Sequence, residues 1–170
     1  MRRPLIAALS LVAAAALAEG GHTAKAELKT ADGKAAGTAT FEETPHGLIV
    51  RATLENLAAG PHAFHIHAVG KCEAPFKTAG GHFNPLGHKH GILAEGGKHA
   101  GDLPNIHVPE SGKAEIEIFV AGVTLKETGK TSVFHEGGTA LVIHAGGDDH
   151  KSDPAGNAGE RIACGVITKG

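Results

Sequence analysis

The chain has 170 residues, a length typical of one domain, with 41% hydrophobic and 20% charged residues. Its formal net charge of −2 excludes a strongly basic nucleic-acid-binding protein and a wholly acidic disordered chain. The composition includes 25 Gly, which predict many turns, and 13 His, which require a chemical explanation because His is the commonest metal ligand.

The N-terminus has the pattern of a secretory signal peptide. Arg2 and Arg3 precede an apolar run from Leu5 to Leu17, and the small residues Ala16 and Ala18 form a cleavage pattern. The alternatives are a membrane anchor or a buried helix, but the run is short for a bilayer-spanning helix. We therefore expect a signal peptide over 1–18, an exported domain over 19–170, and no membrane partner after cleavage.

Export changes the interpretation of the two cysteines, Cys72 and Cys164. In an oxidising compartment they are expected to form a disulfide bond. Such a bond closes a loop of about 90 residues and contributes a few kcal/mol in the chain-entropy treatment. The alternative is a pair of buried free thiols.

After residue 25 the chain consists of short strand-like segments separated by turn residues. The clearest is 113–119, where Ala114, Ile116 and Ile118 fall on one face and charged residues on the other, as in a half-buried antiparallel strand. No segment shows a sustained helical period, so the pattern predicts an all-β sandwich or barrel. The predicted strands are, in chain order, 26–28, a segment ending at Phe41, 48–54, 62–68, 113–119, 139–144 and 162–168.

Two long Gly-rich segments, 69–105 and 146–160, do not fit a strand. Structureless loops of this length are uncommon unless they carry function or are tied down. The histidines concentrate in and around these segments. We therefore expect the functional site to be built from both loops.

An H-x-H motif, His65 and His67, lies within the predicted strand 62–68. On a strand these two side chains project to one face, whereas Phe64 and Ile66 project to the other. The apolar pair is thus free to enter the core while the two imidazoles meet one metal ion. The alternative is a surface pair with no ligand role.

The loop 69–105 supplies further potential ligands. Neutral imidazoles do not hold a loop together by packing, and three nitrogens with one carboxylate oxygen make a sensible four-coordinate zinc set. A third piece is His144, which is followed by Gly146-Gly147-Asp148-Asp149. The candidates in the loop are His82, His88, His90, His99 and Asp102.

Together these motifs resemble those of the copper/zinc superoxide dismutase family. The position of Cys72 in the sequence is similar to that in the exported bacterial branch of the family. The resemblance implies a Greek-key β-sandwich or flattened barrel of about eight antiparallel strands with two long functional loops, in a periplasmic protein. It also implies dismutation of superoxide to O₂ and H₂O₂ by a redox-cycling copper, bridged through a histidine to a structural zinc. The matching stretches, in the family's order and spacing, are GPHAFHIHAVGKC, GGHFNPLGHKHG, KHAGDLPNI, LVIHAGGDD and GNAGERIACGVI.

Position by position, the resemblance implies one copper and one zinc per subunit. Asp148 takes the place of a carboxylate that hydrogen-bonds His65 and His90, although it could instead be a solvated loop acid. Arg161 takes the place of an anion-guiding arginine, although it could instead be a surface charge at a strand end. His82 and Arg161 are therefore the expected catalytic residues. The implied copper ligands are His65, His67, His82 and His144, and the implied zinc ligands are His82, His90, His99 and Asp102.

Several residues receive a weaker assignment. His88 could compete as a zinc ligand, but the family spacing selects His90 and leaves His88 facing solvent. Beyond Arg161, the candidates for attracting superoxide are Lys71, Lys77 and Lys89. A homodimer is compatible with the family, but a monomer is not excluded. The remaining histidines, expected at the surface or in turns, are His22, His46, His62, His107, His135 and His150.

Two other functions fit the sequence less well than the enzyme does. An exported non-enzymatic copper/zinc-binding protein would usually carry a flexible His/Met tract, yet the one Met is residue 1. An immunoglobulin-like interaction module without metals would lack copper ligands, and here the set is complete. The sequence therefore favours a superoxide dismutase.

Overall fold

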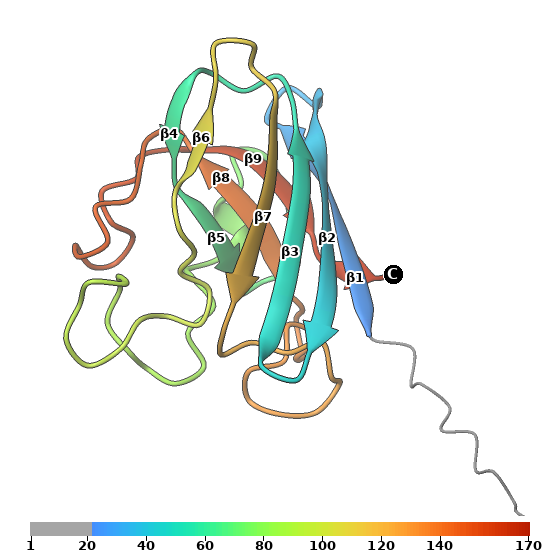
Figure 1. Ribbon diagram of the computed structural model, residues 1–170, viewed down its shortest axis with the longest axis vertical. Coiled ribbons are helices and arrows are strands. Elements are labelled where there is room, and N and C mark those ends of the chain that lie inside the picture. Colours follow the sequence, from blue (N-terminus) through green and yellow to red (C-terminus); the bar gives the residue numbers. More distant parts are fainter. Residues whose placement is uncertain (1–21) are drawn as a thin grey trace, which may run out of the picture.

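A computed structural model describes residues 22–170 (Figure 1). The signal peptide expected over 1–18 lies outside this range. No helix among the described residues is long and apolar enough to span a bilayer. The elements are β1 (Thr23–Thr30), β2 (Ala35–Thr44), β3 (Gly47–Leu54), β4 (Gly60–His62), β5 (Phe64–His67), the 3₁₀ helix η1 (Lys77–Ala79), β6 (Ile106–Val108), β7 (Ala114–Val120), β8 (Ala140–His144), β9 (Arg161–Val166) and β10 (Thr168–Lys169).

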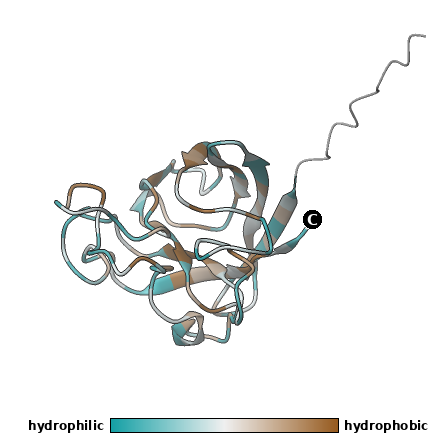
Figure 2. Ribbon diagram, turned by 90° about the horizontal axis from the view of Figure 1, so that it is seen from below, coloured by the Kyte–Doolittle hydropathy of each residue, from teal (hydrophilic) through white to brown (hydrophobic). Residues whose placement is uncertain are grey.

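The strands pair antiparallel throughout. The main sheet has the order β5-β8-β9-β1-β2-β3-β7, with β10 also paired to β1, and β4 pairs with β6. β3 pairs with β7, and β9 pairs with β1, although these strands are far apart in the chain. Such pairings are typical of a Greek key. Seen from below, the strands curl around a common centre (Figure 2). The predicted all-β fold with two long loops is therefore confirmed.

The strands form where apolar residues alternate with polar ones. In β7, Ala114, Ile116 and Ile118 pack against the core, while Glu115 and Glu117 are exposed, as the sequence predicts. This pattern is that of an antiparallel sheet with one solvated face. The outer face of the sheet is therefore polar and exposed at β7.

Strand β8 differs because both of its faces are buried. Leu141 and Ile143 belong to the main core, whereas Ala140 and Val142 pack in a second cluster with Phe76 and Cys164. That second cluster lies beneath the segment held by the Cys72–Cys164 disulfide, which the structure contains as predicted. The continuous apolar run of β8 is thus explained by cover on both sides, and it ends at His144.

The structure divides two of the predicted strands. The segment 62–68 is interrupted at Ala63, whose N–H donates to Gly146 O at 2.8 Å, so that β4 pairs with β6 and β5 pairs with β8. The segment 162–168 is interrupted at Ile167, whose N–H donates to Thr139 O. Strand β6 was not predicted, because three residues are too few to show a period.

The two long connections, 68–105 and 145–160, lie on the same side of the barrel (Figure 1). They are joined directly by main-chain contacts, since the Leu93 N–H donates to His150 O at 3.0 Å. This arrangement brings residues that are far apart in the sequence to one end of β5 and β8.

Candidate metal centre

β5 is an edge strand of the main sheet, and the loop 68–105 covers its free edge. Ile66 donates its N–H to Gly101 O and accepts from the Phe83 N–H, at 2.9 and 2.8 Å. These bonds place His82 opposite His67, and Asp102 opposite His65, as isolated bridges. The loop is thereby held in register with the strand, and its ligands face those of the H-x-H motif.

One group of potential ligands combines β5, the loop and β8. His65, His67, His82 and His144 are all buried, and each offers one ligand atom within 4.8 Å of the others. Phe64 and Ile66 belong to the core, so the predicted division of β5 into a core face and a ligand face is confirmed.

Hydrogen bonds fix one nitrogen of three of these rings. His65 Nε2–H donates to Asp148 Oδ2 at 2.8 Å, His67 Nδ1–H donates to Gly80 O at 2.9 Å, and His144 Nδ1–H donates to Gly159 O at 3.2 Å. Such partners set the tautomer and orientation of metal-binding imidazoles. The other nitrogens are left for a common centre.

That centre has the character of a metal site. Among the described residues, His65 Nδ1 and His82 Nε2 are buried with no hydrogen-bond partner. Leaving a buried polar atom without a hydrogen bond costs about 1–3 kcal/mol. A metal ion bound to these two nitrogens would offset that cost. An all-imidazole set without thiolate suits copper. The residues present therefore fit a copper ion.

Burial also keeps these rings in the form that binds metals. It lowers the pKa of His65 to about 4, of His144 to about 3 and of His67 to about 2. Each of these three imidazoles is consequently neutral near pH 7. A neutral imidazole with a free lone pair is the species that coordinates a metal ion.

The second group consists of His82, His90, His99 and Asp102, again with ligand atoms within 4.8 Å of one another. Asp102 Oδ1 lies 2.7 Å from His82 Nδ1, 3.1 Å from His90 Nδ1 and 3.2 Å from His99 Nδ1. Its Oδ2 accepts the N–H groups of Gly91 and His99, both at 2.9 Å, which orients the carboxylate. Three nitrogens and one oxygen fit a four-coordinate zinc.

The charge of Asp102 is maintained inside this group. Burial alone would raise the pKa of the Asp102 carboxyl, but hydrogen bonds from His82 and from the Gly91 N–H outweigh that effect and hold the pKa well below its usual range. The carboxylate is therefore ionised and able to coordinate a cation.

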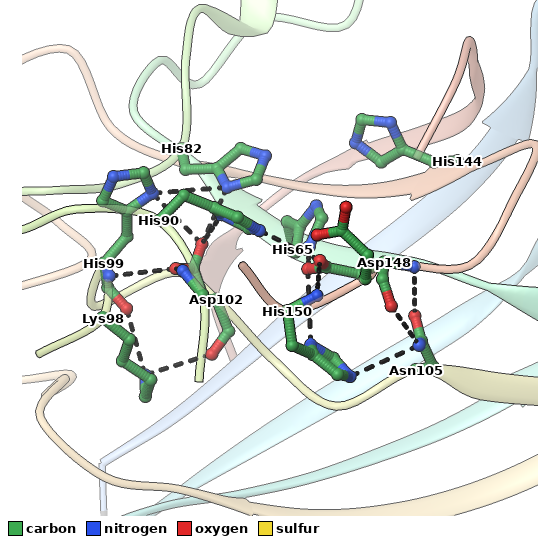
Figure 3. Close-up of polar contacts among 12 residues, drawn as sticks. His65, His82, His90, Lys98, His99, Asp102, Asn105, His144, Asp148 and His150 are labelled. Carbon is green, nitrogen blue, oxygen red and sulfur yellow. Dashed lines mark hydrogen bonds and ion pairs between the residues drawn. The ribbon is translucent and has the colours of Figure 1, made fainter. Parts of the chain in front are cut away.

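Asp148 joins the two groups (Figure 3). Its Oδ2 accepts from His65 and its Oδ1 accepts from His90 Nε2–H at 3.0 Å. Asn105 holds the Asp148 main chain, donating to its carbonyl at 2.9 Å and accepting its N–H at 2.7 Å. Gly156, with a φ of +63°, lies so close that a Cβ would fall 1.7 Å from Asp148 Oδ1. The chain is thus built closely around this carboxylate.

Arg161 begins β9 opposite His144. Its Nη1 donates to Phe76 O and its Nη2 donates to Gly80 O, both at 2.6 Å. Gly80 O therefore serves both Arg161 and His67. After the larger effect of burial, the positive charge of Arg161 also lowers the pKa values of His67 and His144.

Comparison with known proteins decides the family. The family model described as copper/zinc superoxide dismutase (SODC) matches residues 35–167. The chain belongs to the copper/zinc superoxide dismutase family. It is 52% identical over 146 residues to superoxide dismutase [Cu-Zn] 2 of Aquifex aeolicus, covering 85% of each chain, and 43% identical to superoxide dismutase [Cu-Zn] of Caulobacter vibrioides, again covering 85% of each.

A solved structure of the family shows the same architecture. The crystal structure of a SOD-like protein from Bacillus subtilis aligns with a TM-score of 0.80 at 36% sequence identity. The alignment covers 84% of this chain and 96% of the other. The likeness therefore extends over most of both chains.

The structure also places the histidines that the family motifs leave aside. His88 lies outside both groups, and its Nδ1–H donates to Lys98 O at 3.1 Å. The expectation that His62 is a surface or turn residue is wrong, because it is only 2% exposed and its Nδ1 lies 2.7 Å from His144 O. His62 lies in β4, and a three-residue strand is too short to show in the sequence which side chains are buried.

Some residues of the centre were missed by sequence reasoning. Gly80 and Gly159 act through main-chain carbonyls, which no residue type signals. Asn105 is the last residue of the predicted loop 69–105, and its side-chain amide makes two hydrogen bonds with the main chain of Asp148. A lone Asn just before a strand is too common to indicate such a role.

Proposed function

We propose that the chain is a superoxide dismutase that converts two superoxide ions and two protons into O₂ and H₂O₂. Copper would be held by His65, His67, His82 and His144, and zinc by His82, His90, His99 and Asp102. One observation carries the assignment: His82 belongs to both groups, with Nδ1 facing Asp102 and Nε2 buried without a partner. A histidine shared in this way is the residue that would join the two ions.

When bound, copper supplies one-electron redox chemistry and zinc supplies a fixed positive charge without redox chemistry. The first superoxide gives up an electron and leaves as O₂, and the second takes up that electron with two protons and leaves as H₂O₂. His82 can carry one of these protons on Nε2 while Nδ1 stays on the Asp102 side. The second proton comes from solvent. The role proposed for Asp148 is to hold the His65 and His90 rings in place.

Arg161 is proposed to attract and orient the superoxide anion. Replacing it with Gln should slow superoxide decay by about 10-fold, since a focused local charge raises association rates by about 10- to 1,000-fold. The slowing of the wild-type rate by added salt should also weaken, because screening then has less charge to act on. The measurement is the decay rate constant at low and physiological ionic strength.

A matched control for this prediction is Arg51→Gln. Arg51 is an exposed arginine in β3, paired with Glu42 and Glu117 on the outer face of the sheet. Its loss should leave both the rate and its salt dependence nearly unchanged. Equal effects of the two substitutions would show that Arg161 acts only through net charge.

The enzymatic activity itself is tested by pulse radiolysis. Superoxide decay is followed with the chain carrying one copper and one zinc, in the presence of a chelator that captures free copper. A second-order rate constant approaching about 10⁸–10⁹ M⁻¹s⁻¹, the diffusional ceiling, is the expected result. Stoichiometric metal binding without catalysed decay would leave a non-enzymatic metal-binding protein.

We further propose that the protein is exported to the periplasm and that residues 1–18 are removed as a signal peptide. The N-terminal sequence pattern supports this, and so does the Cys72–Cys164 disulfide, because such bonds persist in oxidising compartments. The mature enzyme would comprise residues 19–170. A homodimer remains compatible with the family.

A further inference from the structure

Lys98 immediately precedes His99, a residue of the second histidine group, and its side chain is half-buried. Its Nζ donates to His99 O and to Asp102 O, both at 3.0 Å (Figure 3). The carbonyls that it contacts thus belong to two of the four residues in that group. Lys98 is the first residue of the matching stretch KHAGDLPNI, but it is not among the ligands that the family resemblance implies.

The two carbonyls mark the ends of a tight turn. Asp102 N–H donates to His99 O at 3.1 Å, and His99 N–H donates to Asp102 Oδ2 at 2.9 Å. Lys98 adds a link between the two ends from outside the turn. Its own carbonyl accepts from His88, which fixes its main chain as well. The turn is thereby held on both sides before any metal binds.

The half-buried ammonium group of Lys98 loses part of its hydration, and this loss must be offset by other interactions. Burial lowers the pKa of its ammonium group, while the negative charge of Asp102 opposes that shift. A flexible lysine normally keeps its charged end in water while its stem packs on the protein. Here the two hydrogen bonds to carbonyls offset the lost hydration.

We propose that Lys98 is a positioning residue for zinc, which holds the His99 and Asp102 carbonyls together so that their ligand atoms are spaced for coordination in advance. The inference rests on the proposed assignment of zinc to this group. Residues that orient metal ligands typically contribute about 10- to 100-fold to metal affinity. Lys98 should do so although its own charge repels a divalent cation.

Positioning of the turn should strengthen zinc binding, whereas the charge of Lys98 should weaken it, so the two effects predict opposite changes in zinc affinity when Lys98 is replaced. A Lys98→Met variant should bind zinc about 10-fold more weakly, as measured by competition with a chromophoric chelator. If Lys98 were only a nearby positive charge, its removal would leave zinc binding unchanged or tighten it. Copper affinity should change little, because Lys98 contacts no residue that belongs to the first group alone. The absorption spectrum of Co²⁺ in the second group gives an independent readout of ligand geometry, and it should shift in this variant.

Two further variants complete the experiment. Lys89→Met removes an exposed lysine beside His90 without touching the turn, and it should not weaken zinc binding. Lys98→Arg keeps the charge and the donors, and it should retain most of the zinc affinity even if the Met variant folds poorly. Zinc binding equal in all four proteins would overturn the role of Lys98, whereas a wild-type chain that takes no zinc would overturn the proposed function instead.

Discussion

Replacing His82 with Ala is expected to reduce the rate constant for superoxide decay by about 100-fold or more, the usual contribution of a positioned proton donor. The expectation follows from the double membership of this residue, since it belongs to both ligand groups. Its removal takes a ligand from each group and also the Nε2 that would carry a proton. The rate is measured by pulse radiolysis and expressed per bound copper.

His88→Ala is the matched control for this prediction. His88 lies in the same loop, but it belongs to neither group and bonds only to nearby residues of the loop, including Lys98 O. Its loss should leave most of the activity, with zinc affinity only slightly changed. If His82→Ala kept most of the wild-type rate per copper, His82 would have no essential part in the reaction.

Replacing Cys72 and Cys164 together with Ala is expected to lower the free energy of unfolding by about 4 kcal/mol, because the bond closes a loop spanning 92 positions of sequence separation. The bond links the loop 68–105 to β9, and it covers a small cluster of buried residues around Val142. Denaturant unfolding of the metal-free proteins measures the loss. The expected loss is large relative to the 5–15 kcal/mol of a typical domain.

The same substitution should also affect the site. Phe76 and Gly80, whose carbonyls accept from Arg161, lie in the segment that the disulfide holds. A modest fall in the decay rate should therefore accompany the loss of stability. The wild-type protein treated with a reductant serves as the control and should behave like the double variant. A fall in the free energy of unfolding of less than about 1 kcal/mol would contradict the stabilising role of the disulfide.

The sequence predicted the strands best where one face meets water. In β7 the alternation of Ala114, Ile116 and Ile118 with glutamates was sufficient, because a half-buried strand must show a period of two. In β8 the prediction rested on a continuous apolar run, and only the structure shows the second cluster that covers its other face. The short β6 has no period to detect.

For the candidate centre, the ligand side chains could be predicted from the sequence, but the main-chain groups that orient them could not. The two groups contain the seven residues that the family motifs assign to copper and zinc, since ligand types and their spacing are written in the sequence. The carbonyls of Gly80 and Gly159 and the amide of Asn105 depend on how distant segments meet. His62 was misplaced for the same reason.

His82 is proposed to serve both metal ions. Electron paramagnetic resonance of the protein loaded with Cu²⁺ in the first group and Co²⁺ in the second tests this sharing. A shared imidazole couples the unpaired electrons of the two ions, so the copper signal should weaken strongly as cobalt is added, and should persist unchanged in His82→Ala. A wild-type copper signal unaffected by bound cobalt would show that the two ions do not share this histidine.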